Sequence, residues 1–145
     1  MTYAYFDTSA LVKRYVAERG SLQVRALLRR HDFLSSSITP VEVVSALCRR
    51  RRSGDLSEEN FRRLFRRVQN DRVRWELVEV SSLVLDRAEE LLHETTLSIR
   101  ALDAIQVASW MIFQAASSIQ IPFVTGDARQ RDAATHLGLD VLWVG

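Results

Sequence analysis

The sequence is poor in several features that mark other classes of protein. It has one cysteine, Cys48, so no internal disulfide can form, and this is typical of a reducing compartment. No apolar run approaches the roughly 20 residues that a transmembrane helix needs. The first residues also lack the basic and apolar regions of a signal peptide. We therefore expect a cytoplasmic protein with no membrane-spanning segment.

Lysine is almost absent as well. Of the 20 basic residues Lys13 is the only lysine, so the other 19 are arginines, whose planar guanidinium suits bidentate binding of phosphate. Many of them gather in one short stretch: Arg49, Arg50, Arg51, Arg52, Arg62, Arg63, Arg66 and Arg67. This stretch is either a phosphate-binding surface for nucleic acid or a solvated helix face, and the sequence favours neither interpretation.

The length and the hydrophobic content of the chain are sufficient for one folded domain over residues 1–145. The chain has 145 residues, 47% of them hydrophobic, which suffices for a full core. Short β-prone segments are expected at 3–6, 33–38, 74–80, 121–125 and 141–144. Helical patterns separate them, at 9–16, 21–30, 39–52, 58–71, 83–93, 101–116 and 128–137. This alternation predicts a three-layer α/β/α sandwich with a mainly parallel central sheet.

Four acidic residues lie where predicted helices begin, and each has a purely structural interpretation. Asp7 directly follows a predicted strand and could be an N-cap. Asp127 precedes a predicted helix and has Gln130 three residues later, which is the spacing of a capping box. Glu42 is three residues after Thr39, which is the spacing of a capping box. Asp103 is in the first turn of its helix, where the macrodipole favours an anion. Taken singly, each acid is more typical of a helix start than of a catalyst.

Their joint placement favours a second interpretation. Helices that follow the strands of a parallel sheet begin at its carboxyl edge, so Asp7, Glu42 and Asp127 should gather there. Asp103 falls on the side of its helix that is expected to face the core. Carboxylates brought together repel one another unless a cation neutralises them. A ligand set of oxygen atoms without histidine or cysteine selects Mg²⁺ or Mn²⁺ rather than zinc. The sequence thus predicts a metal site of four acids.

Four motifs in register resemble the PIN-domain family, and the resemblance covers essentially the whole chain. They are Tyr5–Leu11, Thr39–Leu47, Leu102–Ala108 and Phe123–Asp127, each with one of the four acids. The most similar type is the VapC-like toxin of bacterial and archaeal toxin–antitoxin pairs. The resemblance implies a Mg²⁺-dependent endoribonuclease that cleaves RNA, is inhibited by a small antitoxin protein and forms a homodimer.

The resemblance also implies roles for single residues. Asp7 and Asp103 would be direct metal ligands, and Glu42 and Asp127 would complete the acidic pocket, directly or through water. Ser9 and Thr125 would supply hydroxyl groups around the ligands. The expected products carry 5′-phosphate and 3′-hydroxyl ends.

Three alternatives compete with this interpretation. A phosphatase of the haloacid dehalogenase type also has an aspartate at the end of a strand, but it needs a second aspartate two residues later, where this chain has Ser9. A PIN module that binds RNA without cleaving it is disfavoured because all four acids are present. A nuclease of housekeeping RNA processing stays open beside the toxin.

Overall fold

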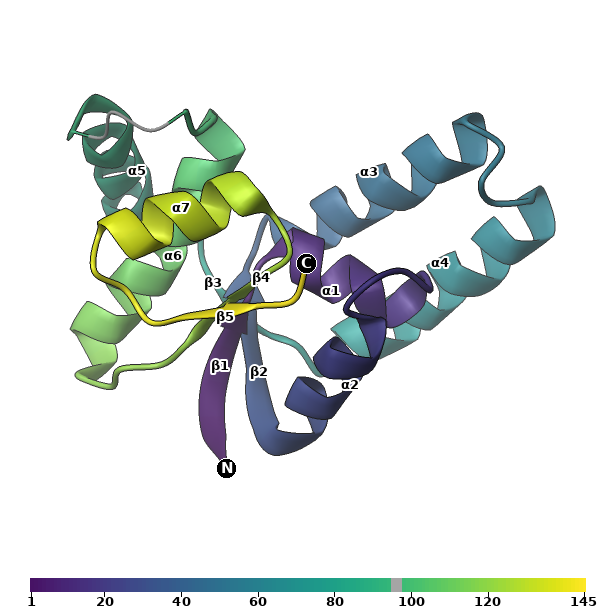
Figure 1. The fold of residues 1–145 in the computed structure, drawn as a ribbon, viewed down its shortest axis with the longest axis horizontal. Coiled ribbons are helices and arrows are strands. Elements are labelled where there is room, and N and C mark those ends of the chain that lie inside the picture. The colour runs from purple at the N-terminus through teal and green to yellow at the C-terminus, as the bar shows by residue number, and fades with distance from the viewer. Residues whose placement is uncertain (95–97) are drawn as a thin grey trace.

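The computed structural model describes residues 1–94 and 98–145. Within them the chain alternates between strands and helices, as the sequence predicts (Figure 1). The elements are β1 (Thr2–Phe6), α1 (Thr8–Tyr15), α2 (Ser21–Arg30), β2 (His31–Ser36), α3 (Thr39–Arg52), α4 (Glu58–Arg72), β3 (Glu76–Val78), α5 (Ser82–Glu94), α6 (Ala101–Ser117), β4 (Phe123–Thr125), α7 (Ala128–His136) and β5 (Val141–Trp143).

The strands form one sheet in the order β3-β2-β1-β4-β5, and every pairing is parallel. The central strand β1 places Tyr5 beside Leu34 of β2 on one side and beside Phe123 of β4 on the other. From β1 the chain adds β2 and β3 in one direction and later β4 and β5 in the other. In such sheets ligands bind beyond the carboxyl ends of the strands, where the strand order reverses. Here that point lies between β1 and β4.

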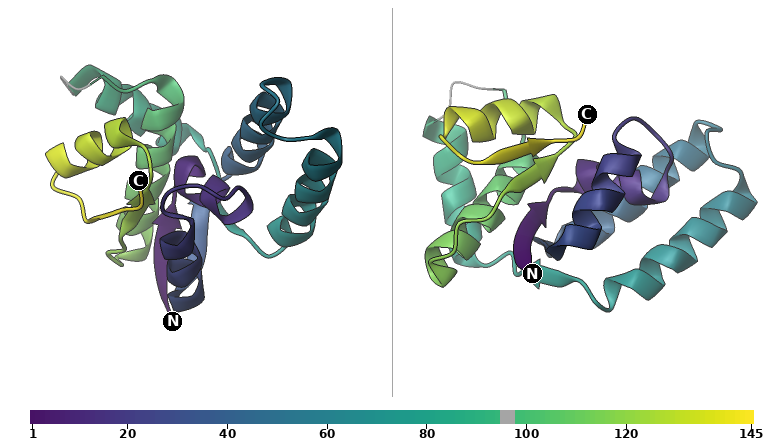
Figure 2. Two further views of the ribbon diagram at one scale, coloured as in Figure 1. Left: turned by 45° about the vertical axis from the view of Figure 1, so that its right-hand side comes forward. Right: turned by 60° about the horizontal axis from the view of Figure 1, so that its bottom comes forward.

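Helices cover both faces of the sheet, which confirms the α/β/α sandwich (Figure 2). Successive residues of a strand point to opposite faces. Tyr5 packs under α5, α6 and α7 together with Trp110 and Phe123. Phe6 packs on the other face, with Val24 of α2 and Val124. Within the part of the chain that the structure describes, no helix is both long and apolar enough to cross a membrane.

Helices α3 and α4 form an antiparallel pair that extends beyond the sheet (Figure 1). They pack on α1 through Leu47 of α3, Val68 of α4 and Leu11 of α1. Ser57 caps α4 by accepting a hydrogen bond from the Asn60 amide, as the sequence predicts. This pair carries the arginine stretch.

Several strands differ in length from the prediction. The third strand is expected over 74–80 but begins at Glu76, because the amides of Arg74 and Trp75 still donate to carbonyls at the end of α4. Conversely, β2 begins at His31, directly after α2, because pairing with β1 starts there. At their carboxyl ends β2 and β3 stop two residues earlier than predicted, at Ser36 and Val78, whereas β1 and β4 end at Phe6 and Thr125 as predicted.

Candidate active site

Asp7 lies at the end of β1 and is 1% exposed. It caps α1 by accepting from the Ala10 amide at 2.9 Å, so its structural interpretation is confirmed. The hydroxyls of Ser9 and Thr125 also donate to this carboxylate. Burial raises the pKa of Asp7 to about 6, although these three hydrogen bonds lower it. The charge of Asp127 raises this pKa further, by a smaller amount.

Glu42 does not belong to a capping box, so that interpretation is wrong. The N-cap of α3 is Ile38, and the Thr39 hydroxyl is bonded to Ser35 and Gln106 within the core. Glu42 Oε1 instead accepts from Thr8 Oγ1 at 2.8 Å and from Gln106 Nε2 at 2.7 Å. Its carboxylate is therefore held by side chains of two other helices.

Gln106 was not among the predicted site residues. It is 2% exposed, within a mostly apolar helix, and it lines the same cavity as the acids. It follows Asp103 by three positions, which places both on one side of α6. That spacing, with a polar residue inside an apolar run, is the signal that could have identified it.

Asp103 and Asp127 both act at helix starts as expected. Asp127 caps α7, accepting from the Arg129 amide at 2.8 Å. Asp103 accepts from the Arg100 amide at 3.0 Å in the first turn of α6. Asp103 is only partly buried, whereas its neighbour Ala104 is in the core. Asp103 therefore lies at the boundary of the core and not within it.

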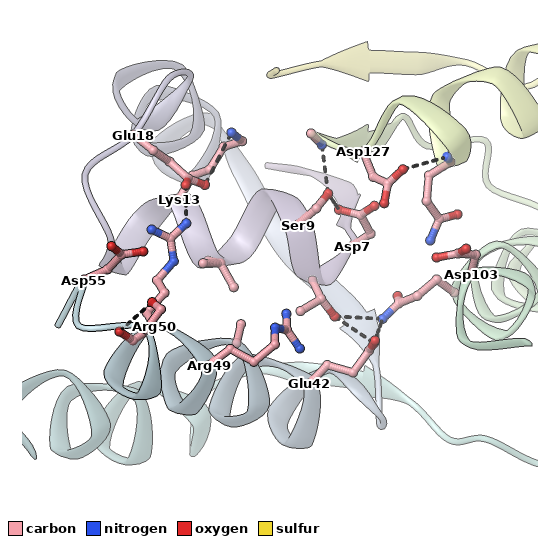
Figure 3. A pocket seen from close by; sticks show the side chains of 17 residues that line it. Asp7, Ser9, Lys13, Glu18, Glu42, Arg49, Arg50, Asp55, Asp103 and Asp127 are labelled. Carbon is pink, nitrogen blue, oxygen red and sulfur yellow. Dashed lines mark hydrogen bonds and ion pairs between the residues drawn. The ribbon is translucent and has the colours of Figure 1, made fainter. Parts of the chain in front are cut away.

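All four acids line one open cavity of about 580 Å³ at the carboxyl ends of β1 and β4 (Figure 3). Figure 3 shows Asp7, Asp103 and Asp127 at one end, with Glu42 reaching in from α3. In residues 1–94 and 98–145, however, no three Asp, Glu, His or Cys side chains are close enough to hold one ion together. The acids share a cavity without forming a preassembled ligand cluster.

The donor chemistry of this end of the cavity still suits a hard cation. Its described lining offers carboxylates, hydroxyls and the Gln106 amide, with no histidine or cysteine. Mg²⁺ prefers such oxygen ligands, and it commonly binds through one or two carboxylates and several waters. Closely packed protein ligands are therefore not required, and the residues fit such an ion.

The opposite end of the cavity carries charges of both signs, from Lys13 and Arg50 and from Glu18 and Asp55 (Figure 3). Lys13 is buried and donates to the carbonyl of Arg19, and its Nζ is 3.4 Å from Glu18. Glu18 also pairs with Arg50. Arg49 donates to Ser45 Oγ at 3.3 Å and forms no ion pair with any described residue.

The arginines of α4 lie elsewhere. Arg62 pairs with Glu58 at 3.2 Å, and the guanidinium of Arg67 is 5.6 Å from the centre of the Tyr15 ring. Neither of them, nor Arg63 or Arg66, is among the described residues that line the cavity. Of the arginine stretch, Arg49 and Arg50 therefore line the cavity, and the four arginines of α4 do not.

The sequence model of the PIN domain matches residues 4–135, which contain all four acids. The chain belongs to the PIN domain family. No curated protein sequence matches it closely enough to count as a relative.

Two solved structures show the same fold. One is a toxin–antitoxin complex from Klebsiella pneumoniae, with 18% identity, 88% of each chain covered and a TM-score of 0.60. The other is VapBC2 from Rickettsia felis bound to a DNA fragment from its promoter, with 16% identity, full coverage of both chains and a TM-score of 0.64.

Proposed function

We propose that this PIN domain is a Mg²⁺-dependent endoribonuclease that hydrolyses RNA phosphodiester bonds. The observation that carries the proposal is the cavity lined by Asp7, Glu42, Asp103 and Asp127, which come from separate segments of the chain and meet where the strand order reverses. PIN domains are generally nucleases, and the family is typically dependent on divalent metal ions. Mn²⁺ should substitute for it, because it binds the same oxygen donors.

Asp7 and Asp103 would hold the ion directly, with Glu42 and Asp127 binding it directly or through water. When bound, Mg²⁺ would neutralise charge on the phosphate and favour ionisation of a water molecule. The protein positions the ligands. Ser9 and Thr125 fix Asp7, and Ser9 is itself fixed by the Gly126 amide at 2.9 Å.

In the reaction, water attacks phosphorus and the bond from phosphorus to the 3′ oxygen breaks. The 3′ oxygen takes up a proton, so the products carry 5′-phosphate and 3′-hydroxyl ends. No imidazole lines the described part of the cavity, so the carboxylates are the groups available to accept the proton from water.

We also propose that the protein is the toxin of a toxin–antitoxin pair, that it forms a homodimer and that an antitoxin inhibits it. The likeness in fold to chains of two toxin–antitoxin complexes supports this role. Expression of the chain alone should then arrest growth, and Asp7→Asn should abolish the arrest. A wild-type chain that is harmless in several hosts would favour a role in RNA processing.

The direct test is incubation of the purified protein with total RNA in Mg²⁺ or in EDTA, followed by mapping of the cut ends. Cleavage in Mg²⁺ that stops in EDTA is expected, with Asp7→Asn inactive. Full activity in the chelator would refute the metal-dependent mechanism.

A further inference from the structure

A smaller apolar cleft of about 290 Å³ adjoins the acidic cavity between α3 and the start of α6. Its apolar lining is Ile38, Val41 and Leu102, and it shares Thr8, Glu42 and Arg49 with the cavity. Val41 is 67% exposed and Leu102 is 51% exposed. Each directly precedes a site acid, Val41 before Glu42 and Leu102 before Asp103. Apolar surface is thus placed at the border of the acidic site.

Arg49 lines both the acidic cavity and the apolar cleft. It follows Glu42 by seven residues, so it lies on the same side of α3 about 10.5 Å further along the helix axis. Its hydrogen bond to Ser45 draws the side chain back toward the N-terminus of α3. Figure 3 shows the guanidinium directed into the cavity on the side of Glu42. Because Arg49 has no ion pair among the described residues, its charge is available to a ligand.

We propose that this cleft binds one nucleotide of single-stranded RNA beside the cleaved bond, with the base on Ile38, Val41 and Leu102 and a backbone phosphate on Arg49. The proposal rests on the proposed function, which places RNA in the adjoining cavity. A nucleotide combines a flat, largely apolar face with an anion, and the cleft presents an apolar surface beside an unpaired cation. Contacts to the face of a base are tolerant of sequence, so little base preference is expected here.

The charge of Arg49 also argues against a purely apolar occupant. A purely apolar protein surface that covered Val41 and Leu102 would take the neighbouring guanidinium out of water without giving it an anion. Burial of an unpaired charge is strongly unfavourable. A second copy of the chain or another protein segment is therefore the competing outcome for the test.

The experiment measures binding in EDTA, so that no cleavage occurs. A fluorescent single-stranded oligouridylate of about 12 nucleotides is compared with a fully abasic oligomer of the same length. Variants are Arg49→Ala and the double variant Val41→Ser with Leu102→Ser. Their controls are Arg52→Ala on the same helix and Leu83→Ser, an exposed leucine of α5 that is 65% exposed and does not line the cleft. Circular dichroism verifies that each variant is folded.

The wild type should bind the oligouridylate at least about fivefold more tightly than the abasic oligomer. The double variant should lose this difference, while Leu83→Ser keeps it. Arg49→Ala should reduce the slope of log affinity against log salt by roughly 0.7, the value of one contact to a single strand, relative to Arg52→Ala.

Equal binding of the two oligomers by the wild type would overturn the base site. Loss of self-association in the double variant, with RNA binding unchanged, would assign the cleft to a protein interface. If the slope of log affinity against log salt is the same in Arg49→Ala and Arg52→Ala, Arg49 does not contact a phosphate. Failure of the wild type to cleave RNA in Mg²⁺ would refute the nuclease function separately, whatever these binding results.

Discussion

The side-chain amide of Gln106 donates a 2.7 Å hydrogen bond to the carboxylate of Glu42, 64 positions earlier in the chain. The amide is oriented by the Tyr5 hydroxyl, which donates to its oxygen at 2.7 Å. Burial holds the pKa of Tyr5 well above its usual value, so this phenol stays a donor. Gln106 therefore links the core beneath the sheet edge to an acid that lines the cavity, and we expect it to position that carboxylate.

Replacing Gln106 by methionine should weaken both the fold and the site. The change keeps a long side chain but leaves the buried Tyr5 hydroxyl without its acceptor, which should lower the free energy of unfolding by about 1–3 kcal/mol. Glu42 also loses one of its two donors. We expect RNA cleavage per folded molecule to fall at least about tenfold, equivalent to about 1.4 kcal/mol, and the Mg²⁺ concentration for half-maximal activity to rise.

The matched control is Ser109→Ala, one turn further along α6. Ser109 is also buried and hydrogen-bonded, to Ser36 and to the Ile105 carbonyl, but among the described residues it has no hydrogen bond to an acid of the cavity. Its loss should affect stability and leave the Mg²⁺ dependence unchanged. If Gln106→Met behaves in the same way, Gln106 has only a structural role.

The metal-free protein should become less stable as pH rises through the range in which Asp7 titrates. Its folded pKa of about 6 exceeds the unfolded value of about 3.9, so the folded state binds more protons between the two. This contribution to the free energy of unfolding is largest below about pH 4, falls through pH 4–6 and then levels off. The decrease is at most about 3 kcal/mol, from about two pKa units at 1.36 kcal/mol each.

Urea unfolding in EDTA at a series of pH values measures this effect. Asparagine is as good an N-cap as aspartate, so Asp7→Asn should keep the cap of α1 and lose the pH-dependent decrease. Asp86→Asn, at an exposed position of α5, should keep it. Parallel pH profiles for the wild type and Asp7→Asn would show that Asp7 is ionised in the folded state as readily as in the unfolded state.

The architecture and the meeting of the acids follow from local patterns. Alternating strands and helices force parallel connections, and parallel connections bring every strand-to-helix junction to one edge of the sheet. The positions of Asp7 and Asp127 after β1 and β4 were sufficient to predict that both lie at this edge. Both are N-caps as well, so a structural role and a place in the cavity coexist in the same side chains.

Long-range pairings could not be predicted in this way. The spacing of Thr39 and Glu42 fits a capping box, but whether the hydroxyl bonds its own helix or Ser35 depends on how deeply β2 and α3 are buried. Likewise the run Arg49–Arg52 predicts a group of positive charges but not where each side chain points. Successive helical residues point about 100° apart, so Arg49 faces the cavity, Arg50 reaches Glu18 and Arg51 stacks 3.9 Å over the Phe61 ring.

The arginines of α4 should contribute little to RNA affinity. Arg62 and Arg67 already have intramolecular partners, and none of Arg62, Arg63, Arg66 and Arg67 is among the described cavity-lining residues. Replacing all four by alanine should change the salt slope of RNA binding by much less than the roughly 2.8 expected for four contacts to a single strand. A decrease near that value would instead assign this face of α4 to the substrate.

Asp103→Asn should separate the charge of this residue from its role at the start of α6. Asp103 accepts from the Arg100 amide, and asparagine keeps an oxygen at that position, so the helix start should survive. In EDTA the variant should be as stable as the wild type or slightly more stable, by less than about 1 kcal/mol, because one of four like charges is removed.

In Mg²⁺ the wild type should be the more stable of the two proteins. Saturation of a native-state site at one hundred times its Kd adds about 2.7 kcal/mol, and the variant should lose most of this gain. Thermal melts of both proteins in EDTA and in Mg²⁺ measure the two effects, with Asp86→Asn as a control that keeps the full Mg²⁺ shift. An equal Mg²⁺ shift in Asp103→Asn and the wild type would place Asp103 outside the metal site and leave it only its bond to Arg100.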